Sequence, residues 1–333
     1  MAIRLEPYEN AQNFPSGSVA MHLGRPRADG AVGMTCDRPP PLVGAVVLNF
    51  RQPQGALAVV DAVTDQGIEH LRLIVVDNAS QDGSAALLNS RGQVEVIELA
   101  QNGGYASGMN AGISRLLADE SVRYVLLLTH DVELRPSCLT LLVEHLDNHP
   151  EAGVVAPMLE RADTTGKLWS SGGYLEGLCR DPVHTGRDTD ASAAPDSGHR
   201  VVEWADGAIL MIRREVFSRI GLLPEQYFLY FEEVHFLLMA GRRGFQTHVV
   251  LAARAAQQPG GAPDYLAARN RVLLARSLFP ARVALVVLHT LVEVLREVGR
   301  RVLRRSYHRT DFVQAVLVGT YDGLTGRLRK TFL

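Results

Sequence analysis

Short apolar runs rich in β-branched residues recur along the first half of the chain and alternate with stretches of helical length. Runs of this kind, bounded by polar and glycine-rich segments, are typical of strands that are buried on both faces. They predict strands at 43–48, 71–76, 94–99 and 124–128. Helices are expected between them, at 54–66, 83–90 and 105–119. This alternation predicts βαβ units, and therefore an α/β fold with a mostly parallel central sheet flanked by helices.

The second half of the chain is less regular. Residues 160–200 are rich in Gly, Asp, Ser and Thr, so we expect an irregular insertion there. Further strands are predicted at 153–157, 201–212 and 246–250, and further helices at 213–220, 232–242 and 263–278. We therefore assign residues 42–280 to one α/β domain.

The two ends of the chain differ from this central domain. Residues 1–41 contain several Gly and Pro residues without sustained periodicity, which predicts a loose N-terminal extension. Residues 281–333 predict two helices, roughly 281–305 and 310–321, that form a basic amphipathic tail. The sequence predicts neither a signal peptide nor an apolar run long enough for a membrane span.

Composition and charge narrow the classes of function. Of the 333 residues, 47% are apolar and 21% are charged, which is ordinary for a globular protein. The formal net charge of −2 argues against a dedicated nucleic-acid binder, because such proteins carry a basic excess. Three cysteines without a CxxC pair indicate a reducing compartment, so we expect a cytoplasmic protein.

Polar or glycine-rich residues follow each of the first four predicted strands. Because the carboxyl ends of parallel strands meet at one edge of a sheet, we expect these residues to form one ligand site. Each segment alone also fits a turn or a helix cap. The residues concerned are Leu48, Asn49, Asp77, Asn102, Gly104 and Asp131.

The common nucleotide-binding motifs do not fit this pattern. A dinucleotide fold needs G-x-G-x-x-G after the first strand, where this chain has Asn-Phe-Arg-Gln-Pro-Gln-Gly, and the sequence has no phosphate-binding P-loop motif. A single nucleotide that carries a diphosphate fits better. Asp77 would bind its base or ribose, and Asp131 would face the phosphates through Mg²⁺ or Mn²⁺, which prefer oxygen ligands.

Eight segments in order resemble glycosyltransferase family 2, and within it the rhamnosyltransferase-like members with a GT-A fold. The resemblance runs from Val43 to Phe279 and includes the strand ends above, 168–173, 204–208, 228–233 and Arg269-Asn270. It implies a GT-A (nucleotide-diphospho-sugar transferase) fold over residues 42–280, with 281–333 as a C-terminal helical extension. It also implies transfer of a sugar from a dTDP- or UDP-sugar to a hydroxyl acceptor, with inversion at the anomeric carbon.

The same resemblance implies roles for individual residues. Asp77 would bind the nucleobase, Asn102 would lie near the donor, and Asp131 would bind the metal. Glu232 and Glu233 stand where the family has the acidic pair that supplies the general base, and which of them acts is open. An attacking hydroxyl must lose its proton, so a carboxylate within hydrogen-bond reach suits the reaction. The expected acceptor pocket consists of Trp169, Trp204, Asp206, Gly207 and Tyr230.

Two departures from the family pattern concern the metal. The D-x-D-like motif reads Thr129-His130-Asp131 and keeps only its last acid, and Gln257 or Gln258 stands where the family has a metal-binding histidine. A neutral amide is a poorer cation ligand, so we expect weak or absent dependence on Mg²⁺ or Mn²⁺. The alternative hypothesis is a non-catalytic nucleotide-sugar-binding relative that has lost its metal chemistry.

The sequence leaves the acceptor and the partners of the tail open. A saccharide, a lipid-linked saccharide and a small natural product are all compatible acceptors. Residues 281–333 hold ten basic and four acidic residues, a net +6. We expect this tail to make a contact rather than to take part in chemistry. It would pack on the catalytic domain, form a homodimer, or bind peripherally to an anionic membrane at its inner face.

Overall fold

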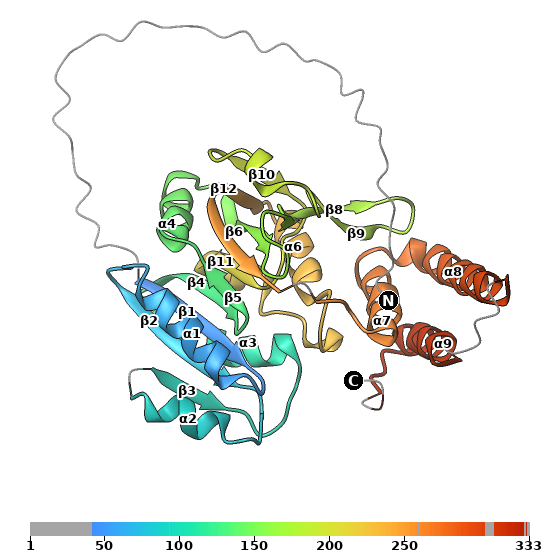
Figure 1. Cartoon of the computed structure of the whole chain (residues 1–333), viewed down its shortest axis with the longest axis horizontal. Coiled ribbons are helices and arrows are strands. Elements are labelled where there is room, and N and C mark those ends of the chain that lie inside the picture. The colour runs from blue at the N-terminus through green and yellow to red at the C-terminus, as the bar shows by residue number, and fades with distance from the viewer. Residues whose placement is uncertain (1–41, 93, 259, 304–309, 330, 332–333) are drawn as a thin grey trace, which may run out of the picture. The chain divides into compact units, whose positions relative to one another are not determined.

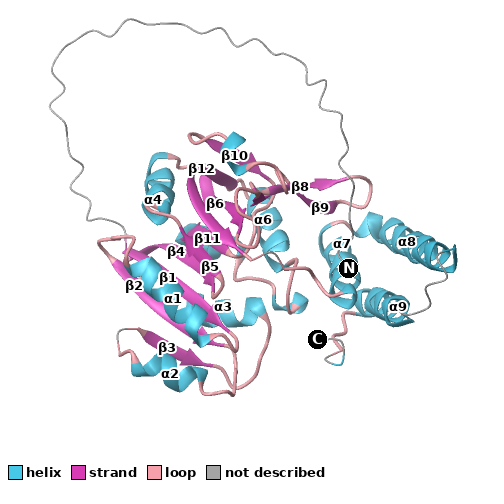
Figure 2. Ribbon diagram, in the orientation of Figure 1, coloured by secondary structure: helices cyan, strands magenta, loops and turns pink. Residues whose placement is uncertain are grey.

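Figures 1 and 2 present the protein as a computed structural model, which describes residues 42–92, 94–258, 260–303, 310–329 and 331. The predicted N-terminal extension, residues 1–41, lies outside the described residues. A ten-stranded sheet forms the centre, in the order β10-β12-β6-β11-β4-β1-β2-β3, with β5 paired to β12 and β7 to β6. Its strands are β1 (Leu42–Asn49), β2 (Leu71–Asp77), β3 (Glu95–Glu98), β4 (Val122–Thr129), β5 (Val132–Leu134), β6 (Ala152–Arg161), β7 (Leu168–Ser170), β10 (His199–Val202), β11 (Ile209–Arg213) and β12 (Gln246–Gln257).

Parallel pairing joins β1 to both β2 and β4, and β2 to β3. The strand β11 runs antiparallel between β4 and β6, and β12 is parallel to β6. The sheet is therefore mostly parallel, as the sequence predicts. A separate two-stranded sheet is formed by β8 (Gly173–Glu176) and β9 (Asp181–His184).

Helices cover both faces of the sheet, which explains the uninterrupted apolar runs of its strands. Val47 of β1 packs in one cluster with α1 (Pro53–Thr64) and α4 (Cys138–Asn148). Val46 points to the other face and packs in a cluster with α3 (Tyr105–Leu117). The other helices are α2 (Ser84–Ser90), α5 (Arg214–Ile220), α6 (Glu232–Arg242), α7 (Asp264–Leu278), α8 (Val283–Leu303) and α9 (Thr310–Thr325), with short 3₁₀ helices at Ala191–Ala193, Glu225–Tyr227 and Pro280–Arg282.

The predicted elements of the first half are confirmed, two predictions for the second half are wrong, and one helix of the first half is absent from the predictions. Residues 201–212 do not form one strand but belong to two, β10 and β11, and residues 203–208 between them contain Asp206 and Gly207, which interrupt the apolar pattern. The region 160–200 is not irregular: it contains β7, β8 and β9, which are too short for periodicity to reveal. The helix α4 was not predicted, although Cys138, Leu142 and Leu146 form its buried face.

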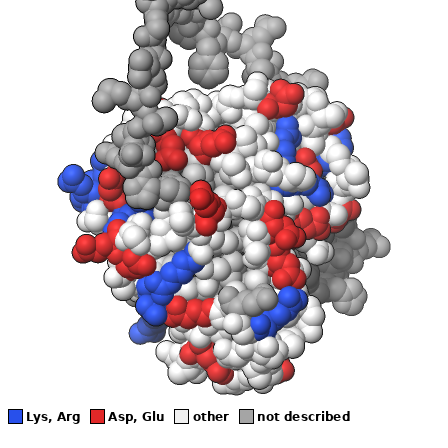
Figure 3. All heavy atoms as spheres, turned by 90° about the vertical axis from the view of Figure 1, so that its left-hand side faces the viewer, with Lys and Arg blue, Asp and Glu red and all other residues white. Residues whose placement is uncertain are grey.

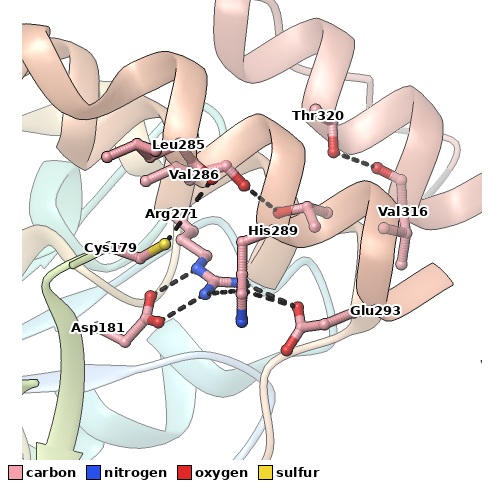
Figure 4. Close-up of polar contacts among 10 residues, drawn as sticks. Cys179, Asp181, Arg271, Leu285, Val286, His289, Glu293, Val316 and Thr320 are labelled. Atoms are coloured by element: carbon pink, nitrogen blue, oxygen red, sulfur yellow. Dashed lines mark hydrogen bonds and ion pairs between the residues drawn. The ribbon is translucent and has the colours of Figure 1, made fainter. Parts of the chain in front are cut away.

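The C-terminal helices pack on α7, which Figure 1 places beside both of them. Val286 of α8 is buried against Val272 of α7. Figure 4 shows Arg271 of α7 between two carboxylates: it donates to both oxygens of Asp181 at 2.5 Å and to Glu293 of α8 at 2.9 Å. Packing, one of the three contacts considered for the tail, is thus observed.

Two surface features bear on possible partners. On the face in Figure 3, acidic and basic side chains are interspersed among uncharged ones, so the described residues there form no continuous basic stripe. Of the described helices, none is long and apolar enough to cross a membrane.

Candidate functional site

The carboxyl ends of β1 and β2 are joined by hydrogen bonds around Asp77. Asp77 is buried, and Asn49 Nδ2 and Ser80 Oγ both donate to its Oδ1 at 2.6 Å. The backbone N–H of Ser80 donates to Oδ2 at 3.1 Å. Asp77 therefore holds the turn that follows β2, and Asn49 attaches this turn to the end of β1.

The glycine-rich loop after β3 is attached to the same turn through Asn78. Its Nδ2 donates to the carbonyl oxygen of Gly104 at 3.0 Å, and the N–H of Gly104 donates to Asn102 Oδ1 at 2.8 Å. Gly104 has a φ of +89°, and a Cβ at this position would lie 1.9 Å from the carbonyl oxygen of Phe228. Only glycine allows this approach, and the N–H of Tyr105 then donates to that oxygen at 2.7 Å.

Residues 227–231, which we call the strap, connect this loop to α6. Phe228, Tyr230 and Phe231 have φ angles of 70°, 69° and 76°, in the left-handed region that disfavours residues with a side chain. Such residues cost of order 1 kcal/mol each and persist only where other contacts fix them. Asn270 of α7 supplies those contacts, because its Nδ2 lies 3.2, 2.9 and 2.9 Å from three strap carbonyl oxygens.

The strap leads to Glu232 and Glu233 in the first turn of α6. Glu232 is buried, and its Oε2 has no hydrogen-bond partner among the described residues. Burial, together with the charge of Glu233, raises the pKa of Glu232 well above its usual range. Burial also raises the pKa of the half-buried Glu233 to about 7, with backbone hydrogen bonds opposing the rise and Asp206 adding to it. Glu233 therefore exchanges a proton near neutral pH.

Two residues of the predicted acceptor pocket, Asp206 and Gly207, lie near Glu233, and a third, Trp169, contacts Asp206. Trp169 Nε1 donates to Asp206 Oδ1 at 3.0 Å, and the charge of Asp206 acts on Glu233. A Cβ built on Gly207 would lie 3.4 Å from the Cβ of Glu233, so the backbone of 207 borders the carboxylate side chain.

His184 of β9 contacts the rings of both tryptophans, Trp169 and Trp204, and it is not among the residues predicted from the sequence. Its ring centroid lies 4.9 Å from that of Trp169 and 4.8 Å from that of Trp204. Burial lowers the pKa of His184, although Asp206 opposes this. Its Nδ1 is buried 3.6 Å from Asp206 Oδ1, beyond hydrogen-bond distance. A lone histidine in a segment rich in Gly and Asp carries no motif that would have found it.

Asp131 is exposed just after β4. Thr129 Oγ1 donates to its Oδ1 at 2.6 Å, and Gln257 Nε2 to its Oδ2 at 3.3 Å. Gln257 therefore faces Asp131 in the way the sequence suggested. Burial raises the pKa of Tyr230, and the charges of Glu232, Glu233 and Asp131 add to the rise, so Tyr230 lies near both the acidic pair and Asp131.

The donor atoms around Asp131 decide whether a divalent cation fits. Mg²⁺ is commonly held by one or two carboxylates together with phosphate oxygens of a substrate. Asp131 supplies one carboxylate, while Thr129 and Gln257 are neutral. The side chains therefore fit a cation that is shared with a diphosphate.

Two predicted site residues make other contacts. Leu48 is buried, and its Cδ1 would lie 2.4 Å from a Cβ on Gly108 of α3, so its side chain packs in the core. Its carbonyl oxygen lies 3.4 Å from His130 Nδ1. Tyr230 Oη donates to the carbonyl oxygen of Gly261 at 3.4 Å.

Known proteins resemble this chain in sequence and in fold. The model of the family described as glycosyl transferase family 2 matches residues 45–221. An N-acetylglucosaminyl-diphospho-decaprenol L-rhamnosyltransferase of Mycobacterium tuberculosis is 24% identical over 215 residues, which cover 59% of this chain and 68% of the relative. A low-salt glycan biosynthesis hexosyltransferase of Haloferax volcanii is 25% identical over 305 residues, covering 83% and 92%.

Among solved structures, a mannosyltransferase from Pyrobaculum calidifontis in complex with GDP-Man and Mn²⁺ has a TM-score of 0.52. Its sequence identity is 12%, and the match covers 88% of this chain and 91% of that one. At this identity the likeness concerns the fold alone, and the predicted GT-A fold is confirmed.

Proposed function

Because the chain belongs to glycosyl transferase family 2 and is a glycosyltransferase, we propose that it moves a sugar from a nucleotide diphosphate sugar to a hydroxyl acceptor, with inversion. The observation that carries this proposal is Glu233. It is a half-buried carboxylate with a pKa of about 7, and it lies beside Asp206 and Gly207. A general base works best when its pKa lies near the working pH.

In the proposed reaction, the acceptor oxygen attacks the anomeric carbon in line with the bond to the diphosphate. Glu233 accepts the hydroxyl proton as the new C–O bond forms, and the electron pair of the broken bond leaves with the diphosphate. Glu232 is the less suitable base, because it is buried and its pKa is raised further. In its neutral form it adds no negative charge next to Glu233.

The donor nucleotide would bind against the turn after β2 and the loop of Asn102 and Gly104. We propose that Asp77 acts here by holding Asn49 and Ser80 in place, because three donors already occupy its carboxylate. dTDP- and UDP-sugars are the donors that we would test first.

A divalent cation would be held by Asp131 together with oxygens of the donor diphosphate. When bound, it would offset the negative charge that builds on the leaving group. With a single carboxylate, the affinity for Mn²⁺ should be weak without the donor and stronger with it.

We further propose a lipid-linked acceptor, encountered at an anionic membrane surface. One relative is named for a diphospho-decaprenol acceptor. In this chain, five exposed apolar side chains recur every three or four residues along α8, which places them on one helix face. This α8 stripe consists of Leu285, Leu288, Leu291, Leu295 and Val298. Exposed apolar rows of this kind mark contact surfaces. The net charge of +6 on residues 281–333 favours a surface of anionic lipid.

A transfer assay tests the proposal. The purified chain is incubated with a panel of nucleotide diphosphate sugars and a diphospholipid-linked saccharide, with and without Mn²⁺. We expect release of nucleoside diphosphate from one donor, and NMR should show the inverted anomeric configuration in the product. Retained configuration would contradict the mechanism. Donor binding without turnover of any sugar would favour the non-catalytic alternative.

A further inference from the structure

Four of the eleven histidines gather at one place in the structure, far from the candidate site in the topology. His145 lies in the last turn of α4, His149 follows that helix, His199 begins β10, and His248 is the third residue of β12. The strands β4 and β6 run in the same direction, because both are antiparallel to β11. The cluster thus lies at the amino ends of β6 and β12, whereas Asp131 follows the carboxyl end of β4.

The four rings are in direct contact. The rings of His145 and His149 stack with centroids 4.1 Å apart, and those of His199 and His248 stack at 4.3 Å. One ring nitrogen from each of His145, His149 and His199 lies within 4.8 Å of the other two. His248 is buried behind them, while His199 is exposed.

Neighbouring hydrogen bonds determine which ring nitrogens keep a free electron pair. Gln246 Oε1 accepts from His248 Nε2 at 2.8 Å, so His248 Nδ1 accepts from His145 Nε2 at 2.9 Å. This arrangement leaves His145 Nδ1 without a proton. His149 Nδ1 donates to Glu151 Oε1 at 3.0 Å, which leaves His149 Nε2 without one. Free electron pairs on oriented imidazoles are what a metal ion requires.

We propose that His145, His149 and His199 bind a transition-metal ion and that Zn²⁺ is the ion that suits them best. Zinc binds imidazole nitrogen at about 2.0–2.1 Å, which separates nitrogens in a tetrahedral site by about 3.4 Å. The three ring nitrogens lie within 4.8 Å of one another, so they would have to approach each other when an ion binds. Glu151 and His248 are the outer hydrogen-bond partners that ligating histidines usually have.

The chemistry of the cluster supports the same ion. Imidazole ligands suit Zn²⁺, Cu²⁺ and Ni²⁺ better than Mg²⁺ or Ca²⁺. A second group of three, Cys179, Asp181 and His289, is a weaker candidate because both oxygens of Asp181 are bonded to Arg271.

A bound ion would join the end of α4 to β10, the strand that begins at the end of the 160–200 insertion. That insertion contains Trp169 and His184 of the candidate functional site. An ion at the histidine cluster would therefore fix one end of the insertion in place. The ion would act on structure, at the edge of the sheet opposite the proposed chemistry.

Calorimetric titration of the full chain with Zn²⁺ tests the proposal, and Co²⁺ provides a visible absorption spectrum of the same site. H149Q and H199Q should each weaken binding by more than tenfold, and E151Q by roughly 10–100-fold, the usual cost of losing an outer partner. The matched control is H70Q, which changes an exposed histidine before β2. It should leave both the affinity and the Co²⁺ spectrum unchanged.

Circular dichroism establishes that each variant is folded. H199Q should disturb folding least, because His199 is exposed. Equal affinities in H199Q and H70Q would overturn the proposal, as would absence of specific Zn²⁺ binding in the unaltered chain. Loss of binding in C179S would assign the ion to the other group instead.

Discussion

Glu232 and Glu233 are adjacent in sequence, but the structure gives them different surroundings. Glu232 is buried with an unpartnered carboxyl oxygen, while Glu233 is half-buried beside Asp206 and Gly207. A base must reach the acceptor and must lose its proton at the working pH. Glu233 meets both conditions better, so our proposal assigns the role of general base to Glu233.

The first prediction concerns Glu233→Gln. The amide keeps the shape of the side chain but cannot accept a proton, so transfer should slow by roughly 10²–10⁴-fold. Donor affinity, measured by calorimetry, should stay unchanged. In the unaltered enzyme, kcat/KM should rise with pH through about 7, since burial raises the pKa of Glu233 to that value. Glu232→Gln is the matched control. Loss of transfer in this variant alone would identify Glu232 as the general base.

The second prediction concerns stability. A carboxyl group whose pKa is higher in the folded state binds more protons there, so its contribution to stability falls as pH rises. For Glu233 this fall runs from the ordinary value of 4.5 to about 7 and then levels off. The substitution Glu233→Gln removes this pH-dependent contribution to stability, because an amide does not titrate. The melting temperature of the variant, relative to the unaltered protein, should therefore be higher at about pH 8 than at about pH 5. A difference that does not change with pH would contradict the raised pKa.

Among the elements, the strap places Glu233, and two distant segments place the strap. Asn270 bonds three of its carbonyl oxygens, and Gly104 lets the glycine-rich loop approach Phe228. The strap therefore connects the proposed donor loop to the proposed base. A change in either segment should disturb the chemistry without touching a reacting group.

The third prediction tests this connection with Gly104→Ala. The new Cβ would meet the carbonyl oxygen of Phe228 at 1.9 Å, so the strap must shift and transfer should fall at least tenfold, because small misplacements are costly. Gly244→Ala is the matched control. Gly244 has nearly the same φ, +88° against +89°, but a Cβ there meets no atom within 4 Å. If Gly244→Ala lowers transfer as much as Gly104→Ala does, backbone strain alone would explain the loss, and the contact with the strap would not.

Apart from α4, the sequence predicts the helices and main strands, which depend on local pattern, and it does not reveal the contacts between distant segments. The strands β1 and β4 are predicted because burial on both faces leaves an almost unbroken apolar run. The pairing of the strap with Asn270 and the position of His184 between two tryptophans join segments far apart in the chain. No local pattern encodes such contacts, and only the family motifs drew attention to residues 228–233 and Asn270.

For the whole molecule, the attachment of α8 leaves an apolar surface uncovered. One side of the helix packs on α7 through Val286 and is tied to Arg271 through Glu293. The α8 stripe faces away from that contact, and its most exposed members are Leu288 at 58% and Leu295 at 69%. A helix that is apolar on both sides needs a second partner, which in our proposal is the membrane.

The fourth prediction is that Leu288→Ser with Leu295→Ser weakens binding to anionic liposomes. Each leucine contributes about 1.5–3 kcal/mol when buried, so the partition constant should fall at least tenfold. Transfer to a water-soluble acceptor should be unchanged. Leu87→Ser on α2, another exposed leucine, is the control and should keep full liposome binding. If light scattering instead shows a dimer that the double variant dissociates, the stripe is a subunit interface.

The long-range attachment of the strap also has a consequence for the order of folding. Contacts between residues close in the chain form early, because closing a short loop costs little entropy. The parallel units β1-α1-β2 and β2-α2-β3 are of this local kind, whereas the strap depends on residues from the glycine-rich loop and from α7. After dilution from denaturant, the sheet should therefore regain its circular dichroism before the enzyme regains transfer activity. The interval between the two signals would measure how late the strap closes.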